Sequence, residues 1–140
     1  QLGEEKVIDS IENIGDGPAL YAVVMRESFH GEGLHFVTSE NHTQQIGYMS
    51  YDAGYKIQAH THSIIDRTIS RTTEVLYVKS GKVLARIYTE ERELFKELFL
   101  FTGDFILLLS GGHGFEIIED SVMIEIKQGP YLGLDDKERF

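Results

Sequence analysis

Two histidines, His60 and His62, stand one residue apart in the segment GYKIQAHTHS, residues 54–63. We expect residues 56–62 to form a β-strand, in which side chains two positions apart project from the same face. Both imidazoles would then point toward one place, as the ligands of a metal ion do. Taken alone, such a pair on a strand is more often an ordinary surface or core pair than a metal-binding pair.

A carboxylate and a third histidine follow this pair along the chain. Glu74 opens an apolar segment that ends at Gly81, and His113 lies in the glycine-rich sequence SGGHG directly after a strongly apolar segment. Neutral imidazole and carboxylate groups suit divalent first-row ions such as Mn, Fe, Co, Ni or Zn. The mouth of a small β-barrel is a place where side chains from different strands converge. These residue types therefore indicate one divalent metal ion of undetermined identity.

The composition narrows the classes of protein to which the chain can belong. Its 140 residues suffice for a single domain, residues 1–140, with a sizeable core. A net charge of −10 argues against nucleic acid and anionic membrane surfaces as partners. The absence of cysteine excludes disulfides and thiolate ligands. No apolar run approaches the roughly 20 residues of a transmembrane helix, and residues 1–6 lack signal-peptide character, so a cytoplasmic location is expected.

Short apolar or alternating segments, separated by turn residues, recur along the chain. The predicted strands are residues 19–25, 34–38, 45–51, 56–62, 74–79, 82–88, 105–109, 115–118 and 122–127. Residues 94–101 are compatible with either a strand or a helical turn. Because Ser80 and Gly81 separate residues 74–79 from residues 82–88, we expect these two segments to form a hairpin. About ten short strands with almost no helical periodicity predict an all-β sandwich or barrel.

The last predicted strand has two different faces. Its apolar row, expected to face the core, consists of Val122, Ile124 and Ile126. The alternating row, expected to face outward or toward a partner subunit, consists of Met123, Glu125 and Lys127. An alternative for Lys127 and Gln128 is that they reach into the pocket at the end of the strand.

The spacings of these residues resemble the motifs of the cupin family. Gly54-x5-His60-x-His62 matches the first half of the first cupin motif, and Glu74-x6-Gly81 matches its second half. In combination these spacings are specific, although each alone is weak.

The resemblance to cupins continues further along the chain. Residues 103–113, GDFILLLSGGH, are similar to the second cupin motif, and the likeness covers roughly residues 45–128. It implies a double-stranded β-helix, or jelly-roll barrel, with one metal ion in its mouth. The ligands that the resemblance implies are His60, His62, Glu74 and His113.

The chain departs from the cupin pattern in its first motif. Eleven residues separate His62 from Glu74, where cupins usually have three or four, and this places Asp66 at the usual distance. We favour Glu74 over Asp66 as the carboxylate ligand because Gly81 and an apolar strand follow it. In the second motif, Leu109 stands where cupins usually have proline.

Four further residues are candidates for binding a substrate. Arg67 and Arg71 lie in residues 63–73, which form either a solvated loop or a lid whose guanidinium groups bind a carboxylate or phosphate. Gln58 shares the strand face of the two histidines, and Tyr48 can line the same interior from the neighbouring strand. Both are equally compatible with core or outer-face positions.

Two classes of function and one further alternative remain open. The first is a metal-dependent enzyme acting on a small polar or anionic molecule, a sugar or a hydroxy or keto acid, as an isomerase, epimerase, lyase or dioxygenase. The chain is also similar to small stand-alone cupins of sugar or cell-surface polysaccharide metabolism. The second is a non-catalytic barrel that binds a small ligand and whose metal is structural. A metal-free barrel similar to the cupin-type sugar-nucleotide epimerases is a third alternative.

The expected assembly is a homodimer. Barrels of the cupin type expose sheet edges and apolar faces, which a second copy can cover. Residues 19–25, outside the matched motifs, are the candidate strand for pairing across such a dimer.

Overall fold

The structure, a computed structural model, describes residues 10–140, except for the side chains of residues 134 and 135. The described chain divides into two compact units. The sheet unit comprises the residues up to Phe29 and the segment Arg71–Phe140, and the small unit comprises His30–Ser70. Both units are built from antiparallel strands, so the all-β prediction is confirmed.

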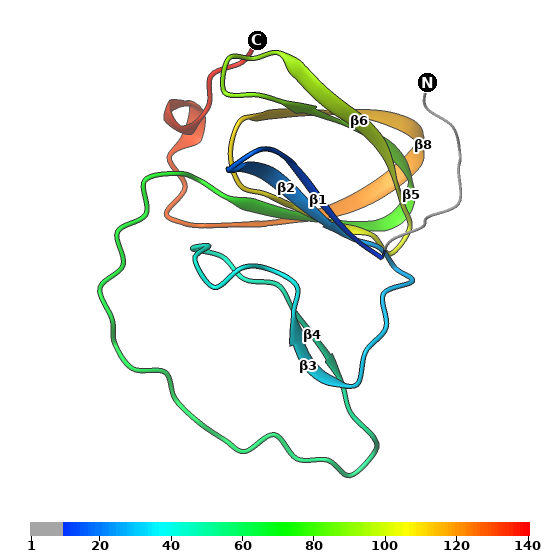
Figure 1. Ribbon diagram of the computed structural model, residues 1–140, viewed down its shortest axis with the longest axis vertical. Coiled ribbons are helices and arrows are strands. Elements are labelled where there is room, and N and C mark those ends of the chain that lie inside the picture. Colours follow the sequence, from blue (N-terminus) through cyan, green and yellow to red (C-terminus); the bar gives the residue numbers. More distant parts are fainter. Residues whose placement is uncertain (1–9) are drawn as a thin grey trace. The chain divides into compact units, whose positions relative to one another are not determined.

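The sheet unit consists of one antiparallel sheet with the strand order β1-β2-β7-β5-β6, in which β8 also pairs with β5 (Figure 1). Its elements are β1 (Ile11–Asp16), β2 (Ala19–Met25), β5 (Glu74–Tyr88), β6 (Leu94–Phe101), β7 (Phe105–Leu108), β8 (Gly112–Lys127) and the 3-10 helix η1 (Gly133–Asp136). The strand predicted at residues 19–25 is confirmed, and residues 94–101, for which strand and helical turn were both open, form strand β6. Strand β1 was not predicted, because its sequence IENIGD mixes apolar, acidic and glycine residues without a clear alternation.

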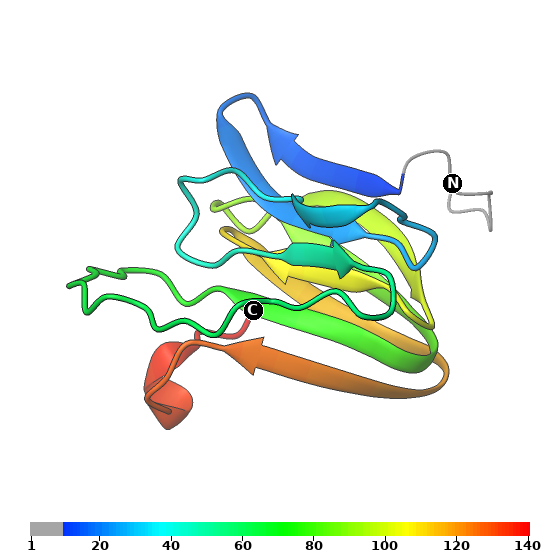
Figure 2. The ribbon, with the colours of Figure 1, turned by 90° about the horizontal axis from the view of Figure 1, so that it is seen from below.

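Strand β5 is the element around which the sheet curls. Its first residues, from Glu74 to Tyr77, pair with β7, and its later residues, from Lys82 to Tyr88, pair with β6. Strand β8 follows β5 along the other edge from end to end. As a result the sheet bends strongly upon itself into a half-barrel (Figures 1 and 2).

The bend in β5 lies at Gly81. The β5–β8 ladder shifts register three times between Val78 and Val83, as β-bulges do. Gly81 has a φ of 106°, and a Cβ atom there would collide with Ser121 and with the carbonyl of Asp120. Only glycine therefore fits this point of the strand.

The predicted hairpin between residues 74–79 and 82–88 is wrong. Both segments belong to β5, and they pair with β7 and β6 instead of with each other. Residues 115–118 and 122–127 likewise belong to one strand, β8. In both places the turn-like residues form a bulge within a continuing strand, where a local pattern suggests a chain reversal.

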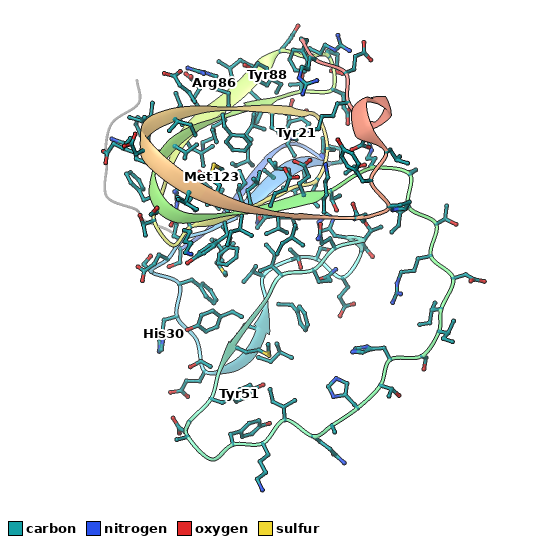
Figure 3. The ribbon with its side chains drawn as sticks, turned by 180° about the vertical axis from the view of Figure 1, so that it is seen from behind. Tyr21, His30, Tyr51, Arg86, Tyr88 and Met123 are labelled. Carbon is teal, nitrogen blue, oxygen red and sulfur yellow. The ribbon has the colours of Figure 1, made fainter. Side chains whose placement is uncertain are left out.

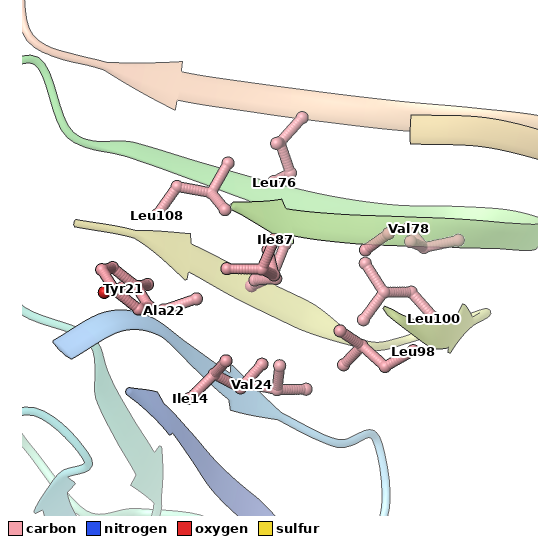
Figure 4. Packing of buried hydrophobic residues seen from close by; sticks show 12 residues of the cluster. Ile14, Tyr21, Ala22, Val24, Leu76, Val78, Ile87, Leu98, Leu100 and Leu108 are labelled. Carbon is pink, nitrogen blue, oxygen red and sulfur yellow. The ribbon is translucent and has the colours of Figure 1, made fainter. Parts of the chain in front are cut away.

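The core lies on the concave side of the curled sheet (Figure 4). Its cluster takes side chains from both halves of the sheet, because the curl brings β2 and β7 opposite β6 and the second half of β5. The cluster consists of Ile14, Tyr21, Ala22, Val24, Leu76, Val78, Ala85, Ile87, Leu98, Leu100, Ile106 and Leu108. Phe115 and Met123 of β8 pack against it, and Figure 3 shows Met123 among the side chains of the sheet unit.

The predicted orientation of β8 is also wrong. The apolar row is exposed, with fractions of 52% for Val122, 44% for Ile124 and 55% for Ile126. Met123 of the alternating row packs on the core. The other members of that row, Glu125 and Lys127, lie at the end of the strand, where an ion pair of 3.5 Å between them accommodates their charges. The sequence alone favours the more apolar row as the buried one, and the register of the ladder overrides that preference.

The proposed pairing role of residues 19–25 does not fit this topology. They form β2, which pairs with β1 on one side and with β7 on the other. Both of its edges are therefore occupied within the chain.

The small unit contains a short antiparallel pair of strands. These are β3 (Gly33–Phe36) and β4 (Gly47–Ser50). Residues 56–62, predicted as a strand, adopt no regular secondary structure, so this prediction is wrong. A strand requires a partner for its ladder hydrogen bonds, and apolar alternation alone does not supply one.

Over residues 10–140, no helix has the length and apolar character needed to cross a membrane.

Candidate functional site

Glu74 and His113 form a close pair inside the sheet unit. The Nε2 atom of His113 lies 3.2 Å from Oε2 of Glu74. In the β5–β8 ladder, however, the two residues occupy opposite ends, where Glu74 opposes Lys127 and His113 opposes Ile87. The curl of the sheet brings these distant ends together across its concave side.

The electrostatic environment keeps Glu74 ionised. The residue is buried, with 7% of its surface exposed. The hydrogen bond with His113 lowers the pKa of the Glu74 carboxyl more than burial raises it, and the positive charges of Lys127 and Lys137 lower it further. The pair therefore presents a buried carboxylate beside an imidazole.

The atoms of this pair fit a shared divalent ion. Imidazole nitrogen and carboxylate oxygen each bind such ions at about 2.1 Å. Two ligands at neighbouring octahedral positions then lie about 3 Å apart, and the Glu74 and His113 atoms are 3.2 Å apart. The same distance also fits a direct hydrogen bond between them.

His60 and His62 form a second pair, in the small unit. Their ring centroids are 5.2 Å apart, and both residues are exposed. Nδ1 of His60 lies 2.8 Å from the backbone carbonyl of Gln58, to which it donates a hydrogen bond. In the neutral ring this contact places the proton on Nδ1 and the lone pair on Nε2, which is the usual arrangement of a metal-binding histidine.

The four predicted ligands thus occur as two pairs in two units. Within neither unit, over the described residues, do three or more His, Asp or Glu side chains gather in a group that could hold a metal ion. Asp66, the alternative carboxylate, is an exposed residue of the small unit.

The two arginines predicted to bind substrate have different surroundings. Arg71 forms an ion pair of 2.6 Å with Glu90, whose Oε1 also accepts the N–H of Gly111 at 3.1 Å. Arg71 therefore helps to fasten the segment before β5 to the loop before β8. Arg67 is exposed in the small unit.

The other two predicted substrate residues also lie in the small unit. Tyr48 is a partly buried residue of β4, opposite His35. Gln58 is exposed, and its backbone carbonyl holds the His60 ring. Its side chain is available for contact with a ligand.

A polar clamp that the sequence does not reveal fixes the position of Glu74. The Thr73 N–H donates to Oε1 of Gln128 at 2.8 Å, and Nε2 of Gln128 donates to Oγ1 of Thr73 at 2.6 Å. Thr73 precedes Glu74, and Gln128 follows Lys127, so the clamp closes the end of the ladder. Only the register of β5 against β8 could have identified it.

Residues near the C-terminus hold to the same end of the sheet unit. Thr72 donates to Asp136 at 2.6 Å, and Arg92 forms an ion pair of 2.7 Å with Glu138. The Phe140 ring packs on Tyr88 with 5.1 Å between centroids. These contacts bring the charge of Lys137 near Glu74, and nothing in the composition of the segment predicts this.

Comparison with known proteins identifies no relative. No family model matches the chain, no curated protein matches its sequence, and no solved structure matches its fold. Inference about function therefore rests on the residues and their geometry.

Proposed function

We propose that the chain binds one divalent metal ion at the mouth of a cupin-like jelly-roll barrel and acts there on a small polar or anionic molecule. The proposed ligands are His60, His62, Glu74 and His113. The observation that carries the proposal is the 3.2 Å approach of His113 to the buried carboxylate of Glu74, from opposite ends of one ladder. The His-x-His pair with a free Nε2 on His60 supports it.

The residues around the proposed site have distinct roles. Glu74 stays ionised at neutral pH, because its pKa is lowered, and so supplies a negatively charged ligand. The Gln58 carbonyl orients His60, and the Thr73–Gln128 clamp holds Glu74 in position. The exposed guanidinium of Arg67 is suited to a carboxylate or phosphate of the bound molecule.

A bound divalent ion would supply Lewis-acid or oxygen-activating chemistry. The first suits isomerases, epimerases and lyases of sugars or hydroxy and keto acids, and the second suits dioxygenases. If no bond changes in the ligand, the same site describes a binding barrel whose metal is structural.

A second candidate function needs no metal. The direct contact between Glu74 and His113 is the arrangement in which a carboxylate orients an imidazole for proton transfer. Such a pair can remove a proton next to a carbonyl group, as a metal-free epimerase does.

Metal analysis of protein purified without added metal or a histidine tag tests the proposal. The wild type is compared with His60→Ala, Glu74→Ala and the matched control Asp66→Ala, and circular dichroism monitors folding. Near-stoichiometric metal that is lost with His60 and Glu74 but retained without Asp66 supports the four-ligand site. A wild type that is metal-free and takes up no ion on titration contradicts it, and the Glu74–His113 acid–base pair then becomes the leading function.

A further inference from the structure

The residues that follow β8 run along one side of the curled sheet, from the end of β8 to the turn between β5 and β6 (Figure 1). We call residues 136–140 the latch. Its first residue, Asp136, accepts a hydrogen bond of 2.6 Å from Oγ1 of Thr72. Because Thr72 lies two residues before Glu74, this end of the latch is tied to the segment that carries Glu74.

At the other end of the latch, the Phe140 ring lies in a seat formed by Tyr88, Arg92 and Gly112. The Tyr88 and Phe140 rings meet edge to face with 5.1 Å between centroids, and the guanidinium carbon of Arg92 lies 5.1 Å from the Phe140 centroid. A Cβ atom on Gly112 would come within 2.7 Å of the Phe140 ring, so glycine leaves the room that the ring fills. Because Gly112 precedes His113, this end of the latch is tied to the segment that carries His113.

Arg92 contacts the latch twice. Its guanidinium forms an ion pair of 2.7 Å with Glu138 and also lies over the Phe140 ring. Arg92 has a φ of 68°, a left-handed conformation that is unfavourable for residues other than glycine. Such strain persists where surrounding contacts hold it, and it often marks a functional position. The two contacts with the latch provide such a hold.

The contacts of the latch are weak enough to open while the sheet stays folded. The side chains of Arg92 and Glu138 are 46% and 80% exposed, and Phe140 is 61% exposed. An exposed ion pair contributes little to stability. Segments with few buried apolar contacts open locally at a much lower cost than the core.

We propose that the latch is a conformational switch of the Glu74–His113 pair. When closed, it holds together the two chain segments that carry these residues, at the observed separation of 3.2 Å. When open, it loosens both segments at once, so that the two side chains can separate and admit a ligand between them. The inference rests on the proposed function for the identity of the site that the latch controls.

Two substitutions open the latch from opposite sides. Phe140→Ala removes the ring, and Gly112→Ala fills its seat. The matched control for the first is Leu132→Ala, because Leu132 is 59% exposed against 61% for Phe140. The matched control for the second is Gly114→Ala, since a Cβ atom there would lie 4.0 Å from Tyr88 and would displace nothing.

Amide hydrogen exchange of the full chain, followed by NMR, measures the response at the far end of the latch. We expect the N–H groups of Thr73 and Glu74 to exchange roughly tenfold faster in Phe140→Ala and in Gly112→Ala, the effect of losing one aromatic pair. Both controls should exchange as the wild type does. Unchanged exchange at Thr73 and Glu74 in either latch variant overturns the proposal. An equal acceleration at the buried Val24 also overturns it, because the variant would then be destabilised as a whole.

The exchange measurement needs neither metal nor ligand, so the latch and the proposed function can fail separately. A chain that takes up no metal, but whose Thr73 and Glu74 exchange faster in both latch variants, retains the latch and loses the metal site. A chain that binds metal, but whose exchange at these residues is unchanged, retains the metal site and loses the latch.

Discussion

Nη1 of Arg26 donates a hydrogen bond of 2.9 Å to Oδ2 of Asp104, and both residues are almost fully buried. Oδ2 of Asp104 also accepts the N–H of Phe101 at 2.8 Å, while Oδ1 accepts the N–H of Glu27 at 2.9 Å. Arg26 donates further to the carbonyl of Phe99 at 2.6 Å. One carboxylate therefore ties the end of β2 to the turn between β6 and β7.

Asp104→Ala is expected to lower the free energy of unfolding by about 3–5 kcal/mol, because it removes the closest ionic partner of the buried Arg26, whose other carboxylate, Glu12, lies 4.0 Å away. Urea denaturation measures the change. The matched control is Asp66→Ala, an exposed carboxylate of the small unit, with an expected effect below about 0.5 kcal/mol. A loss below about 1 kcal/mol for Asp104→Ala would show that the pair adds little stability.

The lowered pKa of Glu74 predicts a dependence of stability on pH. The carboxyl binds its proton less readily in the folded state than in the unfolded state, mainly because of the hydrogen bond with His113. Its contribution is therefore present above the ordinary carboxyl pKa of 4.5 and is lost as the pH falls through the lower folded value. Thermal unfolding between pH 7 and pH 3, with chelator present, should show a smaller loss of stability on acidification in Glu74→Gln than in the wild type. Glu40→Gln, an exposed control, should follow the wild type, and identical profiles for all three proteins would contradict the prediction.

The bend in β5 predicts that Gly81 tolerates no side chain. Gly81→Ala combines an unfavourable φ with a collision against Ser121, so we expect a loss of more than about 2 kcal/mol. Gly17→Ala is the matched control, because Gly17 also has a positive φ of 61° but has open space around it. Its expected loss is about 1 kcal/mol. Equal losses in urea denaturation would mean that the collision is relieved by a small shift of the strand.

The clamp between Thr73 and Gln128 predicts a cost for losing one partner alone. Gln128→Leu leaves the buried Thr73 N–H without its side-chain acceptor, at an expected cost of about 1–3 kcal/mol. Urea denaturation of Gln128→Leu beside the wild type measures this cost. A Gln128→Leu variant as stable as the wild type would show that water replaces the clamp.

The sequence predicts the positions of strands better than their connections. Residues 19–25 form β2 with the predicted bounds, because this apolar segment is enclosed by polar and glycine residues. Residues 94–101, LFKELFLF, lack a clear alternation, and only the structure decides in favour of a strand. The hairpin predicted at Gly81 is wrong, because a glycine between two apolar segments has the same local sequence pattern in a hairpin turn and in a bulge. The row of β8 predicted to face the core is also wrong, because the register against β5, and not the local apolar pattern, determines which row faces the core.

In the candidate site, too, the individual residues were easier to predict than the way in which the fold brings them together. Motif spacing singles out Glu74 and His113, and the structure places them 3.2 Å apart, although their joint binding of a metal stays a prediction. Lys127 and Gln128 were open alternatives for the pocket, and their positions follow from the pairing of Glu74 with Lys127. A pairing between segments so distant in the chain has no local signature.

Glu74 and His113 lie at opposite ends of the β5–β8 ladder. The distance between their side chains therefore depends on the twist and curl of all the residues between them. Each residue of β5 and β8 adds a small rotation, and the gap between the two side chains reflects the total. A substitution on the convex surface, far from either residue, can therefore widen or narrow that gap by altering the local twist. The spacing of the pair can be adjusted in this way while every residue that touches it stays the same.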